Sequence, residues 1–170
     1  EEDAMLEIVR EYNDGLVLYL NSFVNNISVA DELAEDTFVR LGLKKPNHKG
    51  LSAFKTWLYA IGRNLALDYL RRAAREKRVF FCDCTDLPDE ELLEKRYLHE
   101  ERKVELHRAL RRLKPEYRQV LWLIYFEGMT GKETSRIMKK TVHSVETLAY
   151  RARRALKEEL NREGFTCEDL

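Results

Sequence analysis

Residues 130–160 read TGKETSRIMKKTVHSVETLAYRARRALKEEL. Small and apolar side chains recur in the second half at steps of three and four residues, which predicts an amphipathic helix with one side facing a core. These side chains are Val145, Leu148, Ala149, Ala152, Leu156 and Leu160. The other side carries residue types suited to phosphates and base edges. These are Ser144, Glu146, Thr147, Tyr150, Arg151 and Arg154.

A second, shorter helix is expected just upstream. Thr130 followed by Glu133 is a capping-box signature, which predicts a helix that ends at about Lys139. Thr141 is then placed to cap the long helix. Two helices separated by a short turn, the second long and cationic, are typical of a helix-turn-helix whose second helix enters a major groove. An ordinary helical hairpin with a solvated charged side is the alternative.

The charges are sorted along the chain although they balance overall. The 170 residues hold 30 basic and 30 acidic side chains, and only 3 prolines and 7 glycines, which indicates a mostly helical protein. Residues 63–78 contain six basic against two acidic side chains, and residues 139–157 contain six against one. Residues 82–101 contain eight acidic against two basic. This sorting predicts two cationic surfaces for a polyanion and separate acidic surfaces for other partners.

The N-terminal half predicts three helices. The first covers residues 3–26, although Asn13, Asp14 and Gly15 leave open a break in its middle. The second runs from about residue 29 to 43, with Leu33, Phe38 and Leu41 available to the core. Its exposed side is acidic. Acidic residues near the start of a helix can also be explained by their favourable interaction with the helix dipole alone. The acidic residues are Asp31, Glu32, Glu35 and Asp36.

The third helix follows a loop at residues 44–52 and has its own candidate nucleic-acid surface. Trp57 belongs to its apolar stripe, whereas an aromatic ring, an amide and a row of arginines are suited to stacking on unpaired bases and binding them. The surface consists of Tyr59, Arg63, Asn64, Asp68, Arg71, Arg72 and Arg75. A solvated, salt-bridged helix end is the alternative interpretation.

A linker is expected over residues 79–99, because the helical pattern fades into an acidic, proline-containing run. Cys82 and Cys84 lack a second pair of zinc ligands, so free thiols are favoured over a metal site. Helical pattern returns at residue 100. Pro115 suits the first turn of a new helix, which is apolar nearly all round, should form the buried centre of the domain and should end at Gly128. We expect no cofactor, no metal and no catalytic group.

Four blocks together resemble the small extracytoplasmic-function sigma factors of bacterial RNA polymerase. They read DELAEDTFVRL, FKTWLYAIGRNLALDYLRR, LKPEYRQVLWLIYFEGMTGKETSRIM and SVETLAYRARRALKEEL, in the family's order over nearly the whole chain. The resemblance implies an all-α fold of two small helical domains, residues 1–78 and 100–165, joined by the acidic linker. The C-terminal domain would be a four-helix helix-turn-helix domain.

The resemblance also implies a function and partners. The protein would be a dissociable, monomeric sigma factor, not an enzyme, that binds core RNA polymerase and directs promoter recognition and melting. Its partners would be core RNA polymerase, promoter DNA and an anti-sigma factor. No apolar segment is long enough for membrane insertion and the first residues do not resemble a signal peptide. The three cysteines, Cys82, Cys84 and Cys167, are too few and too oddly placed for a disulfide framework, so we expect a cytoplasmic protein.

The family's functional positions can be transferred to this sequence. Asn64 matches a contact to an extruded base beside the loop at residues 44–52, while Arg63, Arg71, Arg72 and Arg75 would hold phosphates. Glu146, Thr147, Tyr150 and Arg151 match major-groove reading positions for the distal promoter element. The clamp-binding helix of the family matches Glu32, Glu35, Asp36, Phe38, Val39 and Arg40.

Some residues depart from the family pattern. Lys139 stands where the family usually has glycine in the turn, and Glu146 replaces a commonly basic residue, so the distal contact is expected to be weaker or differently specific. Glu35 replaces a frequent glutamine. The rival interpretation is a conventional dimeric helix-turn-helix regulator with residues 1–80 as a dimerisation or sensing domain. A helical adaptor that binds only proteins is a third.

Overall fold

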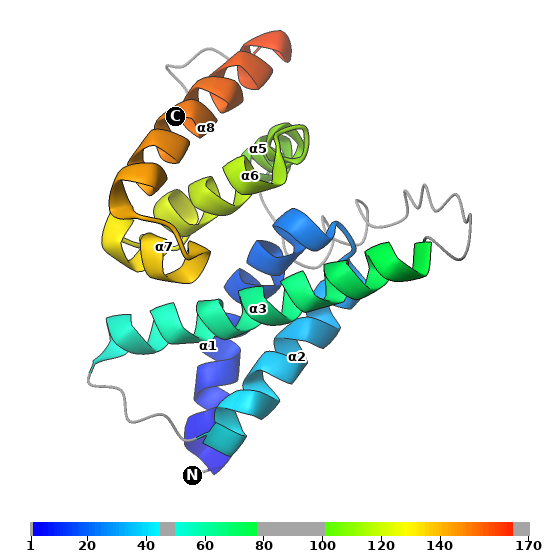
Figure 1. The fold of residues 1–170 in the computed structure, drawn as a ribbon, viewed down its shortest axis with the longest axis vertical. Coiled ribbons are helices and arrows are strands. Elements are labelled where there is room, and N and C mark those ends of the chain that lie inside the picture. The colour runs from blue at the N-terminus through cyan, green and yellow to red at the C-terminus, as the bar shows by residue number, and fades with distance from the viewer. Residues whose placement is uncertain (1, 45–49, 78–100, 165–170) are drawn as a thin grey trace. The chain divides into compact units, whose positions relative to one another are not determined.

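The structure is a computed structural model that describes residues 2–44, 50–77 and 101–164. The predicted linker, its cysteines Cys82 and Cys84, and most of the loop at residues 44–52 lie outside these residues. The chain divides into two compact units, Glu1–Leu93 and Glu94–Leu170, and every element described in either of them is helical. Figure 1 shows the helices of each unit. None of these helices is long and apolar enough to cross a membrane.

In the part of the first unit that the structure describes there are three helices, α1 (Glu2–Val24), α2 (Ile27–Lys44) and α3 (Leu51–Lys77). α1 and α2 form a hairpin, and both contact α3. The break considered for the middle of α1 does not occur. Tyr12, Leu16 and Val17 are all buried around that point, so packing on the neighbouring helices outweighs the low helix propensity of the residues between them.

Two local features set how these helices meet. Asn25 adopts a left-handed conformation, with φ of 56°, between α1 and α2, and the Asn26 side chain accepts a hydrogen bond from the Val29 N–H at 3.1 Å. Gly62 lets α3 approach α1 closely. A β-carbon at that position would lie 3.0 Å from Cδ1 of Leu16, so a larger side chain would push the two helices apart.

The second unit contains α5 (Glu101–Arg111), α6 (Pro115–Leu121), a π-helical turn η1 (Trp122–Phe126), α7 (Gly131–Met138) and α8 (Val142–Arg162). Pro115 is in the first turn of α6, as expected. Gly128 follows η1 with φ of 64°, which confirms the predicted left-handed end. The prediction of a helix that is buried nearly all round was wrong in its last turn, where Tyr125 and Phe126 are 53% and 41% exposed.

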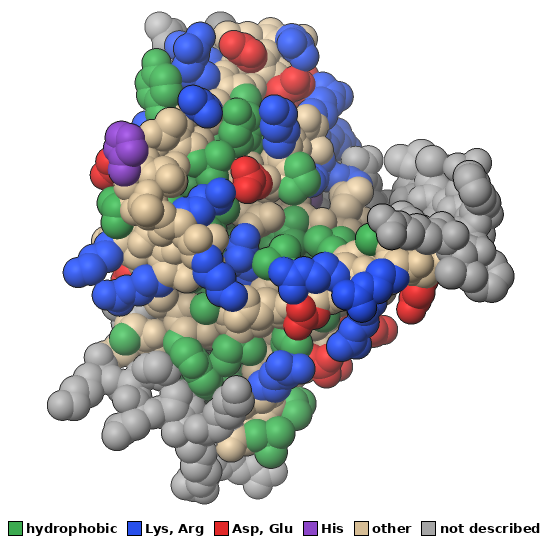
Figure 2. All heavy atoms as spheres, in the orientation of Figure 1, with side chains coloured by type: hydrophobic (Ala, Val, Ile, Leu, Met, Phe, Trp, Pro, Cys, Tyr) green, Lys and Arg blue, Asp and Glu red, His purple; other side chains and the backbone are tan. Residues whose placement is uncertain are grey.

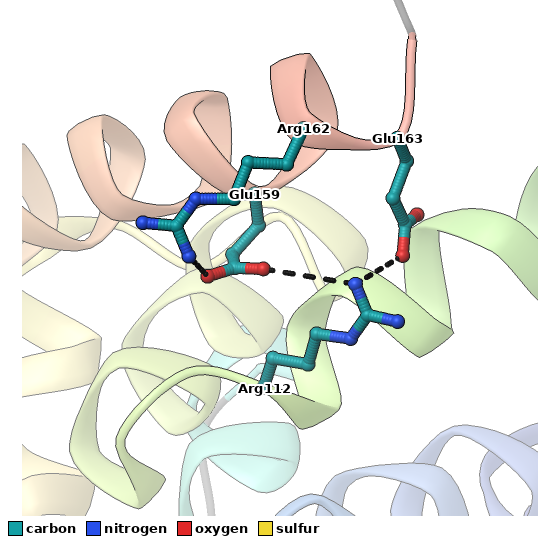
Figure 3. A network of polar contacts seen from close by, with 4 residues as sticks. All are labelled: Arg112, Glu159, Arg162 and Glu163. Carbon is teal, nitrogen blue, oxygen red and sulfur yellow. Dashed lines mark hydrogen bonds and ion pairs between the residues drawn. The ribbon is translucent and has the colours of Figure 1, made fainter.

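α5, α6 and α7 pack against α8. Of the predicted core stripe of α8, Val145, Ala149, Ala152 and Leu160 are buried. Leu148 and Leu156 are half-buried. Ion pairs hold its far end, as Figure 3 shows. Arg112, just after α5, lies 2.6 Å from Glu163 and 3.8 Å from Glu159, and Arg162 lies 2.9 Å from Glu159. These pairs connect the end of α5 to the last turn of α8.

The core of the second unit includes one histidine. His107 is buried and its ring meets the Trp122 ring edge-on, with 6.2 Å between centroids. Burial lowers the pKa of His107 to about 4, and the nearby positive charges of Arg111 and Arg118 act in the same direction. His107 is therefore a neutral core residue at neutral pH.

Candidate nucleic-acid interface

Local hydrogen bonds fix the start of α7 and the start of α8. The Glu133 N–H donates to Thr130 Oγ1 at 3.2 Å and the Thr130 N–H donates to Glu133 Oε2 at 2.8 Å, which confirms the capping box. Lys139 ends α7 in a left-handed conformation with φ of 54°. The Ser144 N–H then donates to Thr141 Oγ1 at 3.1 Å, so Thr141 caps α8 as predicted. This arrangement is a helix-turn-helix.

The predicted reading positions lie together on the outer side of α8. Thr147 is half-buried and the others are exposed, with Tyr150 at 56%. They lie opposite the buried stripe that begins at Val145, so the side of α8 that faces away from its own core is polar and cationic. The exposed positions are Ser144, Glu146, Tyr150, Arg151 and Arg154.

α3 presents a second cationic surface. Figure 2 shows Lys and Arg side chains gathered over the C-terminal half of α3. Arg63 is half-buried, and the other polar members of the predicted surface are exposed, namely Asn64, Asp68, Arg71, Arg72 and Arg75. Asp68 and Arg71 form an exposed ion pair at 3.1 Å, so part of the positive charge is balanced within the helix.

Tyr59 does not belong to this surface. Its side chain is 1% exposed and its ring lies 5.3 Å from the Tyr19 ring, so it packs in the core and not on the predicted surface. Tyr59 lies one turn before Gly62, on the side of α3 that faces α1. The exposed aromatic residue of α3 is instead Tyr69, at 37%, which no sequence signal distinguished from its neighbours.

The outer side of α2 combines acidic and apolar residues. The exposed members of the predicted set are Glu32, Glu35, Asp36, Val39 and Arg40. Phe38 is only 6% exposed, so it packs in the core and not on the exposed side of α2, as its place on the apolar stripe allowed. Leu43, one turn after Val39, was missed and is 80% exposed. Its spacing from Val39 was the available signal.

The described residues contain no group of three or more His, Cys, Asp and Glu side chains that could hold a metal ion. The candidate surfaces are those on α2, α3 and α8. Their chemistry is that of nucleic-acid and protein binding: exposed guanidinium groups, an exposed amide at Asn64, and acidic side chains beside exposed Val39 and Leu43.

Two family models match the chain, one in each unit. The model for sigma-70 region 2 matches residues 8–76, and the model for sigma-70 region 4 matches residues 103–156. The chain belongs to the sigma-70 family. The first matched region covers α2, most of α1 and nearly all of α3, and the second covers the helix-turn-helix.

Relatives narrow the assignment to the extracytoplasmic-function group. The chain is 28% identical to the RNA polymerase sigma-H factor of Pseudomonas aeruginosa over 90% of this chain and 84% of that protein. It is 26% identical to the ECF RNA polymerase sigma factor SigW of Bacillus subtilis over 94% of this chain and 90% of that protein. The protein is thus an extracytoplasmic-function sigma factor, which directs promoter-dependent initiation of transcription.

The fold of this sigma factor is also that of a solved relative. RpoE from Bartonella quintana, in complex with the anti-sigma factor NepR, superposes with a TM-score of 0.72 at 20% identity, over 95% of this chain and 98% of that one. At this identity the likeness concerns the fold. It agrees with the predicted all-α architecture and the C-terminal helix-turn-helix domain.

Proposed function

We propose that this sigma factor assigns one task to each of its three exposed surfaces. α2 binds core RNA polymerase, α3 holds the melted proximal promoter element, and α8 reads the distal element in the major groove. The main support for this proposal is the geometry of α8, a capped helix that exposes its predicted reading positions opposite a buried stripe. That geometry is what insertion into a groove requires.

The exposed residues of α2 indicate the chemistry of its partner. Glu32, Glu35 and Asp36 lie on the same helix as Val39 and Leu43, which are 61% and 80% exposed. Large apolar side chains beside a row of carboxylates are suited to a protein surface that offers both apolar and basic groups. We assign this surface to core polymerase, with Leu43 in place of the buried Phe38.

Asn64 and the arginines of α3 divide the work on the open strand. The exposed Asn64 amide has donors and an acceptor for the edge of an unstacked base, whereas Arg72 and Arg75 offer charge to phosphates. Capture of an unpaired base offsets part of the cost of melting, which is a few kcal/mol. Asp68 partly balances the positive charge of Arg71, so the contribution of Arg71 to phosphate binding should be smaller.

The residues of α8 are assigned to duplex readout. Arg151 and Tyr150 are exposed and suited to base edges and phosphates, and the Glu146 carboxylate can accept from a cytosine amino group. Each DNA contact is weak alone. Because both surfaces belong to one chain, binding of the first raises the effective concentration of the second, provided that the spacing of the elements matches.

The proposal extends to partners and place of action. The solved relative RpoE is bound to an anti-sigma factor, and we propose that this sigma factor, as a monomer, is likewise held by one. Core RNA polymerase and promoter DNA are in the bacterial cytoplasm, so we propose that the protein acts there. The catalytic chemistry belongs to polymerase, so we assign this chain neither an enzymatic activity nor a cofactor.

The test is capture of bacterial core polymerase by the tagged protein, followed by transcription with the reconstituted enzyme on fragmented chromosomal DNA. Binding together with new promoter-dependent transcripts would support the proposal. The double variant Glu35→Lys/Asp36→Lys should lose polymerase. Asp3→Lys/Glu7→Lys, which makes the same charge change on exposed acids of α1, should retain it. Failure to bind polymerase, with dimeric attachment to duplex DNA alone, would instead support a conventional regulator.

A further inference from the structure

Tyr125 and Arg153 form a contact that the sequence did not predict. The Arg153 Nη1 donates to the Tyr125 hydroxyl at 2.6 Å, across 28 residues of sequence. Tyr125 comes from the π-helical turn η1, in which the Glu127 N–H donates to the Trp122 carbonyl at 3.1 Å. A π-turn holds more residues than an α-turn and so changes the direction of the side chains that it carries. Here that direction brings the exposed phenol of Tyr125 to α8.

The partner of Arg153 differs in charge from the partners of Arg112 and Arg162. Arg112 and Arg162 are held by the carboxylates of Glu163 and Glu159 (Figure 3), so their positive charge is largely balanced. Arg153 is held by a neutral phenol, and among the residues that the structure describes no carboxylate pairs with it. A neutral anchor fixes the direction of a guanidinium group without reducing its charge. The remaining N–H donors of Arg153 stay available for an anion.

Arg153 is also placed beside the proposed reading positions. It follows Tyr150 by three residues and Glu146 by seven, so these three side chains lie along one edge of the outer side of α8. A helix in a major groove has a phosphate backbone on each side, and arginines at its edge position the helix through phosphate contacts. An oriented, unbalanced arginine at this edge is suited to that role.

We propose that Arg153 is a phosphate contact of the DNA-reading helix and that Tyr125 is the residue that positions it. The inference rests on the proposed function of α8 as the duplex reader. Holding the side chain before DNA arrives reduces the conformational entropy that binding removes. Tyr125 thus increases affinity without contacting a base, and it acts through Arg153.

The test measures binding of the full chain to a labelled duplex of mixed sequence, about 30 base pairs long, over a range of about 50 to 200 mM salt. Arg153→Gln should weaken binding about tenfold and reduce the slope of log K against log salt by about 0.9. Tyr125→Phe should weaken binding about threefold and should add nothing in the Arg153→Gln background. Arg162→Gln is the matched control, because it removes the same charge from α8 at a carboxylate-held position.

The outcomes separate this inference from the function on which it depends. One outcome is that Arg153→Gln shows the same slope of log K against log salt as Arg162→Gln, while Arg151→Gln and Arg154→Gln bind DNA more weakly. In that case α8 reads DNA and only the inference about Arg153 is overturned. If none of these variants changes binding, the proposed function of α8 fails with it. Thermal unfolding of Tyr125→Phe detects a merely structural contact. Lost stability with unchanged DNA affinity would overturn the positioning role.

Discussion

α3 and α8 both turn one side to a core and a cationic side to solvent, yet they are held in place by different means. α8 is fixed at its start, where Thr141 caps the first turn and Lys139 forms the preceding left-handed turn. α3 is fixed in its middle, where Gly62 allows contact with Leu16 of α1. The first device involves residues within a few positions of one another. The second depends on a helix more than forty residues away.

The difference suggests how each surface responds to change. The first turn of a locally fixed helix keeps its conformation when neighbouring helices shift, and this suits the reading of a regular duplex. A helix fixed by packing transmits changes in the core to its exposed side, so the position of Asn64 depends on the fit of α1 beneath it. Perturbing the two devices separately tests this contrast.

The largest effect is expected at the close approach of α3 to α1. Gly62→Val would place branched carbons against Leu16, Leu20 and Thr37, whose atoms lie 3.0 to 3.4 Å from a β-carbon at this position. Such overpacking should destabilise the first unit by about 2–3 kcal/mol. Urea denaturation monitored by circular dichroism measures it, and Ala74→Val, at an exposed position of α3, is the control for β-branching. Equal losses in both variants would contradict the tight contact.

A smaller effect, confined to the unit that carries α8, is expected on acidification. The pKa of His107 is about 4 in the folded state, below the ordinary value of 6.5, so the unfolded chain takes up the proton first as the pH falls. Stability is full above pH 6.5 and is lost between 6.5 and about 4. Between about pH 7.5 and 5 the loss from this residue should be roughly 2 kcal/mol.

The pH effect is measured as the difference in unfolding free energy between the two pH values. His107→Gln should reduce that difference by roughly 2 kcal/mol, even if it lowers stability at both. His143→Gln, an exposed histidine of α8, serves as the control and should keep the wild-type difference. An unchanged difference in His107→Gln would show that the acid sensitivity arises elsewhere.

The same contrast explains what the sequence could predict. The capping box at Thr130, the cap at Thr141 and the end at Gly128 depend on adjacent residues, and all three were predicted correctly. Tyr59 and Phe38 were assigned to surfaces but are buried. Tyr59 is covered by Tyr19 of α1, a residue from a distant part of the chain. The exposure of Tyr69 and the contact of Tyr125 with Arg153 also depend on tertiary structure, whereas the spacing of Leu43 from Val39 was a local signal that was missed.

Specificity provides a third test, in which the two helices should respond differently. Arg151→Ala should relax selection at the distal element, with a loss of roughly 1–3 kcal/mol in discrimination if Arg151 reads a base. Asn64→Ala should leave that selection intact and reduce permanganate reactivity in the melted region. Selection of promoters from a random library by the reconstituted polymerase measures the first. Relaxation at the same element in both variants would contradict separate tasks.

The smallest effect is expected at the turn that sets α8. Lys139 has φ of 54° and ψ of 46°, a left-handed conformation in which a β-carbon is strained. Lys139→Gly removes that strain, partly offset by the greater freedom of glycine when unfolded, and should stabilise the unit by about 0.5–1 kcal/mol. Lys139→Ala keeps the β-carbon and should give no gain, which separates backbone strain from loss of the charge.

Asn25, at φ of 56° between α1 and α2, is the counterpart in the other unit. Because asparagine tolerates this conformation, Asn25→Gly should gain less than Lys139→Gly in urea denaturation. Equal gains would mean that the turn before α8 is no more strained than the turn between α1 and α2.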